Sequence, residues 1–478
     1  MAKVFVLNPP FKIPLIREGR CQSPQNMRKT SIPQLTLAYI SAFLSKNGHL
    51  VQTLDCIASD LHDEQVFDIA KQFDPQVILI NTTTPSISSD LNFAETFKRK
   101  FPNCFLAVFG THVTALHKTL IYEHPFLDFI IRGEPEWLSL ALVSSLEKHE
   151  FTDSSLPGCT FRWQGQVHIS AEPEFPNDLD SLGFPAWNHF DLSKYIHPVL
   201  GKPYLMVNTS RGCSHGCIFC VGHLFYGKKV RFRSISSIIE ELENHVIGKF
   251  NIRHVWMYAD DFTANPAFVK ELCRQIIKRK IRITWWTNTR VDRPDEEMFR
   301  LMKEAGCYML SIGGESGSDE ILKTIRKGTH PDQIKRTIRL LKKVGINSLV
   351  YFLIGLPGET RESIRKTIDF SKKINPDYVE FYPATPYPGT EFFNYAKNNN
   401  IIKVESWEKY LCGGSEFVLE IPGVEKGELN FILRQAYREF YFRLSYAFSF
   451  FKRSLKPAEL FRLITFGLGY FKRFFFSE

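Results

Sequence analysis

The 478-residue sequence predicts an α/β protein. We expect an N-terminal, doubly wound, Rossmann-like parallel sheet, then a partial (β/α)6 barrel and a C-terminal helical region. Short apolar runs alternate with amphipathic helical stretches over residues 1–148, and again over residues 204–395. Such alternation favours parallel strands joined by crossover helices. Because hydrophobic residues make up 44% and charged residues 23% of the chain, a mostly disordered or fibrous protein is excluded.

We predict four parts, with boundaries at residues 148, 203 and 395. Residues 149–203 form a connector that is rich in proline and aspartate and contains a hairpin around Gly165. In the first part the expected strands lie at 3–7, 50–55, 77–81, 105–109 and 129–132, and the helices at 35–47, 63–73, 89–101 and 136–148. In the barrel the strands lie at 204–210, 255–259, 284–288, 308–313, 348–354 and 378–382, and the helices at 236–250, 265–279, 295–305, 331–344 and 360–374.

Polar turns follow the strands of the first part. Ligands of a doubly wound sheet bind beyond the carboxyl ends of its strands. Glycine and small hydroxyl residues allow close backbone approach and hydrogen bonding to phosphate or amide groups. Taken singly, each of these segments is better explained as an ordinary turn or helix cap. The turns are Asn8-Pro9-Pro10, Thr82-Thr83-Thr84-Pro85-Ser86, Gly110-Thr111-His112 and Gly133-Glu134-Pro135-Glu136.

In this order the turns resemble the cobalamin-binding domain found ahead of many radical S-adenosylmethionine enzymes. The resemblance implies nucleotide-tail contacts at Thr82, Thr83, Thr84 and Ser86, and further cobalamin contacts at Asn8, Gly110, His112, Gly133 and Glu134. One feature departs from many such domains, which carry Asp-x-His-x-x-Gly after the first strand with the histidine on cobalt. Here Asn8-Pro9-Pro10-Phe11 stands there, and the nearest match, around His62, is interpreted as a loop and a helix start. Either cobalt lacks this histidine or cobalamin binding has been lost.

Three cysteines lie together directly after the first strand of the barrel. Cys213, Cys217 and Cys220 have the spacing Cys-x3-Cys-x2-Cys. Three thiolates can bind three irons of a [4Fe–4S] cluster and leave the fourth iron open. The amino and carboxylate groups of S-adenosylmethionine (SAM) suit that open position. The alternative is a structural zinc site, which usually needs a fourth ligand such as His215 or His223.

Polar motifs also follow the later strands of the barrel, where the chemistry of such barrels takes place. Asp260 and Asp261 can bind the ammonium of SAM, and Arg290 can pair with its carboxylate. Glu315 and Ser316 can bind the ribose or the amino group. Each of these residues can also be explained as a helix cap or a solvated side chain. Phe219, Gly355 and Pro388 complete the expected SAM contacts, the last two beside adenine.

With this barrel, residues 1–395 resemble cobalamin-dependent radical SAM enzymes, the group of class B methyltransferases, the anaerobic Mg-protoporphyrin ester cyclase and hopanoid-biosynthesis enzymes. The resemblance implies a reduced cluster that cleaves SAM to a 5′-deoxyadenosyl radical. That radical removes hydrogen from an unactivated carbon, and in the methyltransferases methylcobalamin then supplies the methyl group. The resemblance also implies an external electron donor such as flavodoxin or ferredoxin.

The other cysteines allow a competing family. Methylthiotransferases carry three spread cysteines ahead of a similar barrel, and Cys21, Cys56 and Cys104 are also spread. Cys56 and Cys104 lie within or near expected strands, so we interpret them as small core residues. No secretory segment is recognised and no apolar run reaches ~18 residues, so a reduced cytoplasm is the expected compartment.

The end of the chain has its own composition. Residues 434–478 contain nine basic and three acidic residues, eleven phenylalanines and four tyrosines, and they account for most of the net charge of +9. We expect helices at 433–452 and 458–476. They form either a helical cap on the barrel or an interfacial helix pair that contacts the inner membrane face peripherally. Nucleic acid is disfavoured, because phenylalanine outnumbers the basic residues and no recognition motif is found.

The sequence therefore predicts an enzyme that uses a [4Fe–4S] cluster, SAM and cobalamin. We expect C-methylation of an unactivated carbon on a hydrophobic or lipid-like metabolite. One alternative is radical oxidation, cyclisation or carbon–carbon bond formation without methyl transfer. Another is a non-catalytic corrinoid- or metal-binding protein. The identity of the substrate is not encoded in any motif.

Overall fold

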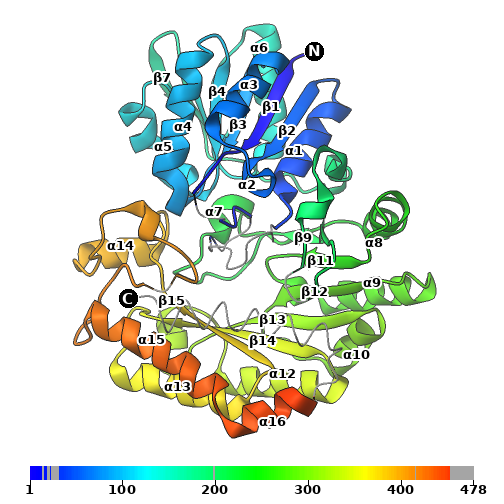
Figure 1. Ribbon diagram of the computed structural model, residues 1–478, viewed down its shortest axis with the longest axis vertical. Helices are drawn as coiled ribbons and strands as arrows, with labels where there is room; N and C mark the ends of the chain where they lie inside the picture. Colours follow the sequence, from blue (N-terminus) through cyan, green and yellow to red (C-terminus); the bar gives the residue numbers. More distant parts are fainter. Residues whose placement is uncertain (13–14, 19–21, 23–31, 198–199, 415, 453–478) are drawn as a thin grey trace.

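The computed structural model describes residues 1–12, 15–18, 22, 32–197, 200–414 and 416–452. Two large sheets lie one above the other, and α7 (Gly222–Tyr226) lies between them (Figure 1). The chain enters the first sheet at one end of the molecule and builds the second sheet at the other end, where the last described helices also lie (Figure 1).

The first sheet has the strand order β2-β1-β3-β4-β5-β6-β7, with β1 to β5 parallel. The order of the first five strands is that of a doubly wound sheet, whose switch point lies between β1 and β3. This part of the fold prediction is confirmed. The strands are β1 Lys3–Asn8, β2 Leu50–Asp55, β3 Val77–Asn81, β4 Phe105–Phe109, β5 Phe129–Ile131, β6 Cys159–Trp163 and β7 Gln166–Ile169.

Two features of this sheet differ from the expectation. The hairpin expected in the connector, β6 and β7, adds to β5 as an antiparallel edge of the sheet. A helix, α5, begins directly after Gly110, where only a binding turn was expected; its many threonines and histidines give it weak helix propensity. The helices are α1 Leu35–Lys46, α2 Cys56–Ser59, α3 Asp63–Phe73, α4 Ile87–Lys100, α5 Thr111–Glu123 and α6 Pro135–Lys148.

The second sheet is a six-stranded parallel sheet with the order β15-β14-β13-β12-β11-β8. Its strands neighbour one another in chain order, as in a partial (β/α)6 barrel, so this prediction is also confirmed. A small hairpin of β9 (Ser210–Arg211) and β10 (Arg231–Phe232) flanks it. The strands are β8 Leu205–Asn208, β11 His254–Tyr258, β12 Thr284–Thr289, β13 Cys307–Glu315, β14 Asn347–Ile354 and β15 Tyr378–Pro383.

The helices of the barrel cover one face of this sheet (Figure 1). Alternate residues of β14 and β15, such as Val350, Phe352 and Phe381, are fully buried in the core beneath them. The residues between these are half-buried, so the opposite strand face is partly open to solvent. The helices are α8 Ile235–Glu240, continued as a π-helix over Glu241–Lys249, α9 Pro266–Lys278, α10 Glu296–Glu304, α11 Asp319–Thr324, α12 Pro331–Val344, α13 Arg361–Ile374 and α14 Glu391–Asn398.

The C-terminal region follows α14. The expected single helix at 433–452 is wrong, because the chain forms α15 (Lys426–Tyr441) and α16 (Leu444–Lys452) with a break at Phe442. The break follows from packing: Leu433, Tyr437 and Phe440 of α15 are buried on the barrel, so this segment is a helical cap. The second expected helix, 458–476, lies outside the described residues. No helix among the residues that are described is long and apolar enough to span a membrane.

Candidate functional site

The cysteine loop lies between β9 and α7, at the carboxyl end of the first barrel strand. Its middle is tied to the barrel, since the Ile218 N–H donates to the Ile325 carbonyl (3.2 Å) and the Ile218 carbonyl accepts from the Phe392 N–H (3.0 Å). Cys217 is 8% exposed, and Cys213 and Cys220 are half-buried. In the described part of the chain, no three Cys, His, Asp or Glu side chains are arranged to hold a metal ion. The loop therefore brings the thiols into one region without bringing them to a common point.

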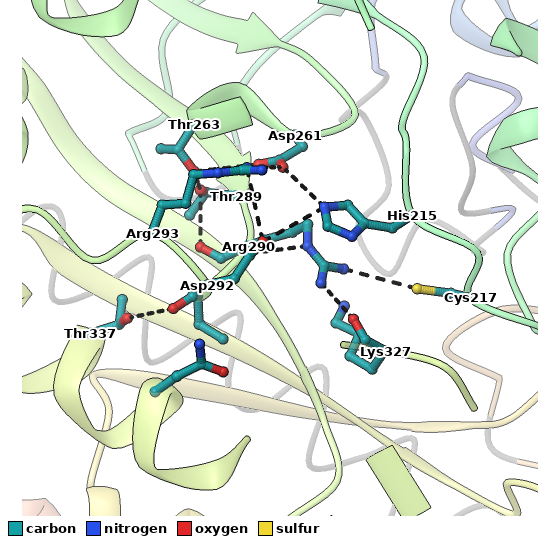
Figure 2. Close-up of polar contacts among 12 residues, drawn as sticks. His215, Cys217, Asp261, Thr263, Thr289, Arg290, Asp292, Arg293, Lys327 and Thr337 are labelled. Carbon is teal, nitrogen blue, oxygen red and sulfur yellow. Dashed lines mark hydrogen bonds and ion pairs between the residues drawn. The ribbon is translucent and has the colours of Figure 1, made fainter. Parts of the chain in front are cut away.

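Arg290, at the carboxyl end of β12, links the cysteine loop to the loops that follow β12 and α11. Figure 2 shows its guanidinium reaching in three directions. It donates to the Asp292 carboxylate (3.0 Å), to the Lys327 carbonyl (2.5 Å) and to the Cys217 sulfur (3.9 Å). Arg290 thus connects the cysteine loop with the loop that contains Lys327.

His215, between the first two cysteines, joins the same network. Its Nε2 lies 3.9 Å from an Asp261 oxygen and 3.7 Å from an Asp292 oxygen (Figure 2). Asp261 also accepts from the Thr263 hydroxyl at 3.3 Å and contacts Arg293 at 3.5 Å. The neighbouring Asp260 accepts from the Gly212 N–H at 3.0 Å, at the start of the cysteine loop. Both expected aspartates are thus at the loop.

Glu315 lies at the end of β13 and pairs with Lys327 at 2.6 Å, with both side chains under 10% exposed. Glu315 adopts a left-handed backbone conformation with φ of 59°, which is unusual for a residue with a side chain. Lys327 was not predicted, because it lies in a loop after a short helix and no motif marks it. The Lys327 carbonyl accepts a hydrogen bond from Arg290, and the Lys327 ammonium donates to Glu315. Lys327 therefore connects two of the expected site residues.

Other expected SAM contacts are not connected to this network by the observed bonds. Ser316 is fully buried and its hydroxyl bonds to Thr367 of α13 (3.0 Å). The Gly355 N–H donates to Glu359 (2.6 Å), and burial raises the pKa of the Glu359 carboxyl to about 8. Phe219 is half-buried in the cysteine loop. Pro388 is buried, in a turn that packs against Leu224 of α7 and Ala115 of α5 through Gly389.

The first domain brings its polar turns together at the ends of β3 and β4. Thr83 and Ser86 share a hydroxyl bond of 2.6 Å, and Ser86 donates to Asp90 at 2.6 Å. The Thr82 hydroxyl donates to the Phe109 carbonyl at 2.8 Å. Gly110 lies so close that an added Cβ would be 2.1 Å from the Thr82 carbonyl oxygen. The expected nucleotide-tail residues therefore form one cluster beside Gly110.

His112 extends this cluster toward the C-terminal region. Its Nδ1 lies 3.3 Å from the Thr84 hydroxyl, and its ring packs edge-on against Trp407 with 5.0 Å between the ring centres. Burial lowers the pKa of His112 to about 3, so the ring is neutral near pH 7. Sequence reasoning missed Trp407, because it comes from a segment nearly 300 residues away that carries no motif.

Gln22 also belongs to this cluster and was not predicted. Its amide donates to the Thr111 hydroxyl (2.7 Å) and accepts from the Thr84 N–H (2.8 Å). Arg17 likewise pairs with Asp90 at 2.8 Å, with both side chains fully buried, and burial raises the pKa of Asp90 to about 6. Both residues come from the stretch after β1, where the sequence shows no periodic pattern.

Three expected cobalamin contacts face elsewhere. Asn8 donates to Asp55 at 2.7 Å, at the end of β2. The Gly133 N–H donates to the Thr114 hydroxyl at 3.2 Å. Glu134 points to the barrel, where it pairs with Arg211 and Arg231.

Two sequence interpretations of single residues agree with the structure. His62 stands directly before α3, and its N–H donates to Gln65, so it marks a helix start. Cys56 and Cys104 are 1% and 4% exposed within the core of the first domain, as expected for small apolar residues. Cys21, the third cysteine of the competing family, lies outside the described residues.

Comparisons with known proteins identify the family. Residues 207–371 match the Radical SAM superfamily, and residues 27–142 match the B12 binding domain. Over 414 residues the chain is 33% identical to an uncharacterized methyltransferase of Pyrococcus horikoshii, covering 87% of this chain and 89% of the relative. This chain belongs to the B12-binding radical SAM enzymes.

Other members of the family carry different names. The anaerobic magnesium-protoporphyrin IX monomethyl ester cyclase of Rubrivivax gelatinosus is 28% identical over 422 residues, covering 86% of this chain and 74% of the cyclase. The cobalamin-dependent SAM radical enzyme OxsB shares the fold, with a TM-score of 0.76 and 16% identity over 98% of this chain and 71% of that chain. The family thus includes at least one cyclase beside enzymes named as methyltransferases.

As a B12-binding radical SAM enzyme, the chain uses a [4Fe–4S] cluster, SAM and cobalamin, with a small-molecule substrate and a reductant. The donor chemistry of the site fits these groups. Three thiols in one loop match in number and kind the ligands that a [4Fe–4S] cluster with one open iron requires. The hydroxyl groups gathered at Thr82, Thr83 and Ser86 suit hydrogen bonding to phosphate or amide groups of a ligand.

Proposed function

We propose that this chain is a methyltransferase that replaces a hydrogen on an unactivated carbon of a hydrophobic or lipid-like small molecule with a methyl group. One observation carries the proposal: the cysteine loop of the barrel and the Glu134 turn of the B12 domain meet at Arg211. The carboxyl ends of both parallel sheets thus face one another, so the two cofactors share one reaction space. The methyltransferase name of the 33% identical relative supports the choice of reaction.

Most of the expected residues receive a role in this proposal. When bound, the reduced cluster supplies the electron for SAM cleavage, and cobalamin supplies the methyl carrier. Cys213, Cys217 and Cys220 bind the cluster. Asp260 and Asp261 would bind the ammonium of SAM, and Arg290 would bind the SAM carboxylate. The guanidinium of Arg290 also contacts the Cys217 sulfur. Phe219, Glu315, Ser316, Gly355 and Pro388 complete the SAM site, and Thr82, Thr83, Thr84, Ser86, Gly110 and His112 form the proposed cobalamin set.

The substrate class follows from the half-buried strand face of the barrel. On this face Tyr351 and Tyr382 stack with ring centres 5.6 Å apart, and Trp256 and Trp286 stack at 5.8 Å. Glu380, which accepts a hydrogen bond from the Tyr382 hydroxyl, is a charged member of the face. Broad aromatic surfaces favour flat or aliphatic apolar ligands. The half-buried members are Trp256, Met309, Leu349, Tyr351, Leu353, Tyr378, Glu380 and Tyr382.

The proposal is tested with anaerobically reconstituted full-length protein. We expect iron and cobalt to bind, and 5′-deoxyadenosine to form from SAM with reduced flavodoxin or ferredoxin. Cys217→Ala should abolish 5′-deoxyadenosine formation. Cys273→Ala is the matched control, because Cys273 is fully buried in the barrel core, away from the loop. Intact SAM cleavage in Cys217→Ala would overturn the assignment of the cysteine loop.

The reaction type is tested separately. A deletion strain is compared with its parent by untargeted metabolite analysis, and the missing product is made again with methyl-labelled SAM. Label in the product supports methyl transfer. A product without label indicates cyclisation, oxidation or carbon–carbon bond formation, as the relation to the cyclase allows. Bound iron and cobalt with no 5′-deoxyadenosine would indicate a non-catalytic binding protein.

We also propose peripheral membrane contact through the basic, aromatic end of the chain, at the inner face of the membrane. At the described start of this end, Phe442, Leu444 and Phe448 are 68%, 90% and 64% exposed. Basic residues near exposed aromatic residues favour anionic lipid surfaces. The test is sedimentation with anionic vesicles of the full chain and of a variant with Arg462, Lys472 and Arg473 changed to Glu. Equal binding would exclude the contact.

A further inference from the structure

The side chains of two glutamates of the B12 domain form ion pairs with arginines of the barrel domain. Glu134 directly precedes α6 and Glu136 lies in its first turn, and both face Arg211 at the end of β9. Arg211 contacts Glu136 at 2.7 Å and Glu134 at 3.3 Å. Glu134 also makes a short bond to Arg231 of β10, the strand that pairs with β9. All four side chains are 1–2% exposed, so these pairs lie in a solvent-free part of the domain interface.

Aromatic rings from both domains also pack on Arg211. Its guanidinium lies 5.3 Å from the ring centre of Tyr39 in the B12 domain and 5.2 Å from that of Tyr226 in the barrel. Arg231 in turn donates to the carbonyls of Tyr226 (2.9 Å) and Pro176 (2.7 Å). Removing one carboxylate would leave a buried cation without its counter-charge, which is strongly unfavourable. The position of Arg211 therefore depends on the two glutamates.

Arg211 stands two residues before Cys213, and the backbone of Gly212 between them is tightly packed. Gly212 has φ of 86°, and an added Cβ would lie 2.2 Å from the Lys229 carbonyl oxygen. Its N–H donates to Asp260 at 3.0 Å. The bond to Asp260 and the close packing on Lys229 hold this short backbone segment, so a shift of Arg211 is passed on to the first cysteine.

We propose that Glu134 and Glu136 are positioning residues that fix the start of the cysteine loop on the B12 domain and so set the separation of the two cofactor sites. This role replaces a corrinoid contact for Glu134, since both of its oxygens are taken by arginines. The inference rests on the proposed function in one respect, that Cys213, Cys217 and Cys220 bind the cluster.

The barrel offers a matched control. Arg233 and Glu241 form a short, fully buried pair, and Glu241 lies on the barrel's own π-helix. Glu241→Gln also removes the nearer carboxylate of a buried arginine, whose second carboxylate, Asp180, lies at 3.7 Å, so it should lower global stability too. It does not remove a bond between the domains. A general loss of stability can thus be separated from release of the loop.

The experiment measures amide hydrogen exchange over residues 209–221 in the full chain without cofactors. We expect Glu134→Gln/Glu136→Gln to speed exchange in this segment by about tenfold or more relative to Glu241→Gln, at conditions of equal global stability. Equal exchange in the two variants would overturn the proposal. If the double variant does not fold, Glu136→Gln alone is compared with Glu241→Gln. The single variant is expected to fold, because Glu134 still neutralises both arginines.

A second readout uses the reconstituted protein. Electron paramagnetic resonance of the reduced cluster and of cobalt(II) reports their magnetic coupling, which depends on their separation. We expect the coupling to become weaker or heterogeneous in Glu134→Gln/Glu136→Gln and to stay unchanged in Glu241→Gln. An unchanged coupling in the double variant counts against the proposal. Since the exchange experiment needs no cofactor, failure of SAM cleavage would overturn the proposed function without touching this result.

Discussion

The hydroxyl of Tyr437 lies 3.0 Å from both the backbone nitrogen and the backbone oxygen of Phe381. One helical turn later, the Tyr441 hydroxyl makes the same two bonds with Val379, at 3.0 and 2.6 Å. Val379 and Phe381 belong to β15, the edge strand of the barrel sheet. An edge strand presents unpaired N–H and carbonyl groups, and here two tyrosines of α15 satisfy four of them.

Removing these hydroxyls should destabilise the barrel. Tyr437→Phe and Tyr441→Phe each leave a buried N–H and carbonyl unsatisfied, so we expect each to lower the free energy of unfolding by about 1–3 kcal/mol. Denaturant titration of the full chain measures this. Tyr122→Phe is the control, because Tyr122 is 64% exposed and its hydroxyl can bond to water. A Tyr437→Phe variant as stable as Tyr122→Phe would contradict the edge-capping role.

Gly110→Ala should be one of the most damaging small substitutions in the B12 domain. The new Cβ would lie 2.1 Å from the Thr82 carbonyl oxygen, and φ is 132° at this position. We expect a loss of about 3 kcal/mol or more from overpacking and backbone strain together. Gly48→Ala, with φ of 85° and no heavy atom within 4 Å, should lose only about 1–2 kcal/mol. Thermal unfolding distinguishes the two, and equal losses would show that the contact with Thr82 is unimportant.

The Glu315–Lys327 pair should behave as a buried ion pair. Lys327→Met leaves the Glu315 carboxylate buried without its cation, and we expect it to cost about 3–5 kcal/mol of stability. Adding Glu315→Gln should recover part of this loss, so the two changes are not additive. The exposed pair Glu362 and Lys366, at 2.8 Å, is the control and should show no measurable coupling. An additive double-mutant cycle at Glu315 and Lys327 would exclude a direct interaction.

Glu359 should make the stability of the barrel depend on pH. Burial raises the pKa of its carboxyl from 4.5 to about 8, although the N–H groups of Gly355 and Leu356 donate to it. The folded state therefore binds this proton more tightly than the unfolded state. Its stabilising contribution is complete below pH 4.5 and is lost as the pH rises to about 8.

Glu359→Gln removes this titration. We expect the free energy of unfolding of the parent chain to fall by up to ~1.4 kcal/mol per pH unit more steeply than that of the variant between pH 5 and 8. Urea titrations at several pH values measure the two slopes. Glu64→Gln, at an exposed position on α3, should keep the parent slope. Parallel slopes for the parent and Glu359→Gln would mean that Glu359 is already ionised at the lower pH.

The sequence was sufficient for features with a local signal. β14 alternates apolar residues in a strand period and is followed by Gly355-Leu356-Pro357-Gly358, so both its extent and its end were predictable. The proximity of the three cysteines in one loop also follows directly from their spacing in the sequence. The break of the C-terminal helix at Phe442 has no such signal, since Phe442 and its neighbours continue an apolar pattern, and only packing on β15 decides where α15 ends.

Residues whose role depends on distant partners were missed for the same reason. Lys327 has no sequence signal, and its role appears only when folding brings it into contact with Glu315. In the same way, Gln22 has no signal beyond its polarity, and its role appears only when it bonds to both Thr84 and Thr111. Glu134 was recognised as part of a functional turn, but its partners Arg211 and Arg231 lie 77 and 97 residues later. Sequence spacing contains no information on such contacts, which only the arrangement of the two domains creates.

The contacts of residues 407–412 have a consequence for the order of synthesis. Trp407 covers His112, the Cys412 N–H donates to the Gln22 carbonyl, and Glu408 pairs with Lys12, 396 residues earlier. At ribosomal speeds of 5–20 residues per second, the B12 domain is complete for roughly 13 to 52 s before this covering segment emerges. Throughout that interval the Thr84 and His112 cluster faces water on the side that Trp407 later covers. The nascent chain thus presents this side of the B12 domain to solvent before the last part of the protein exists.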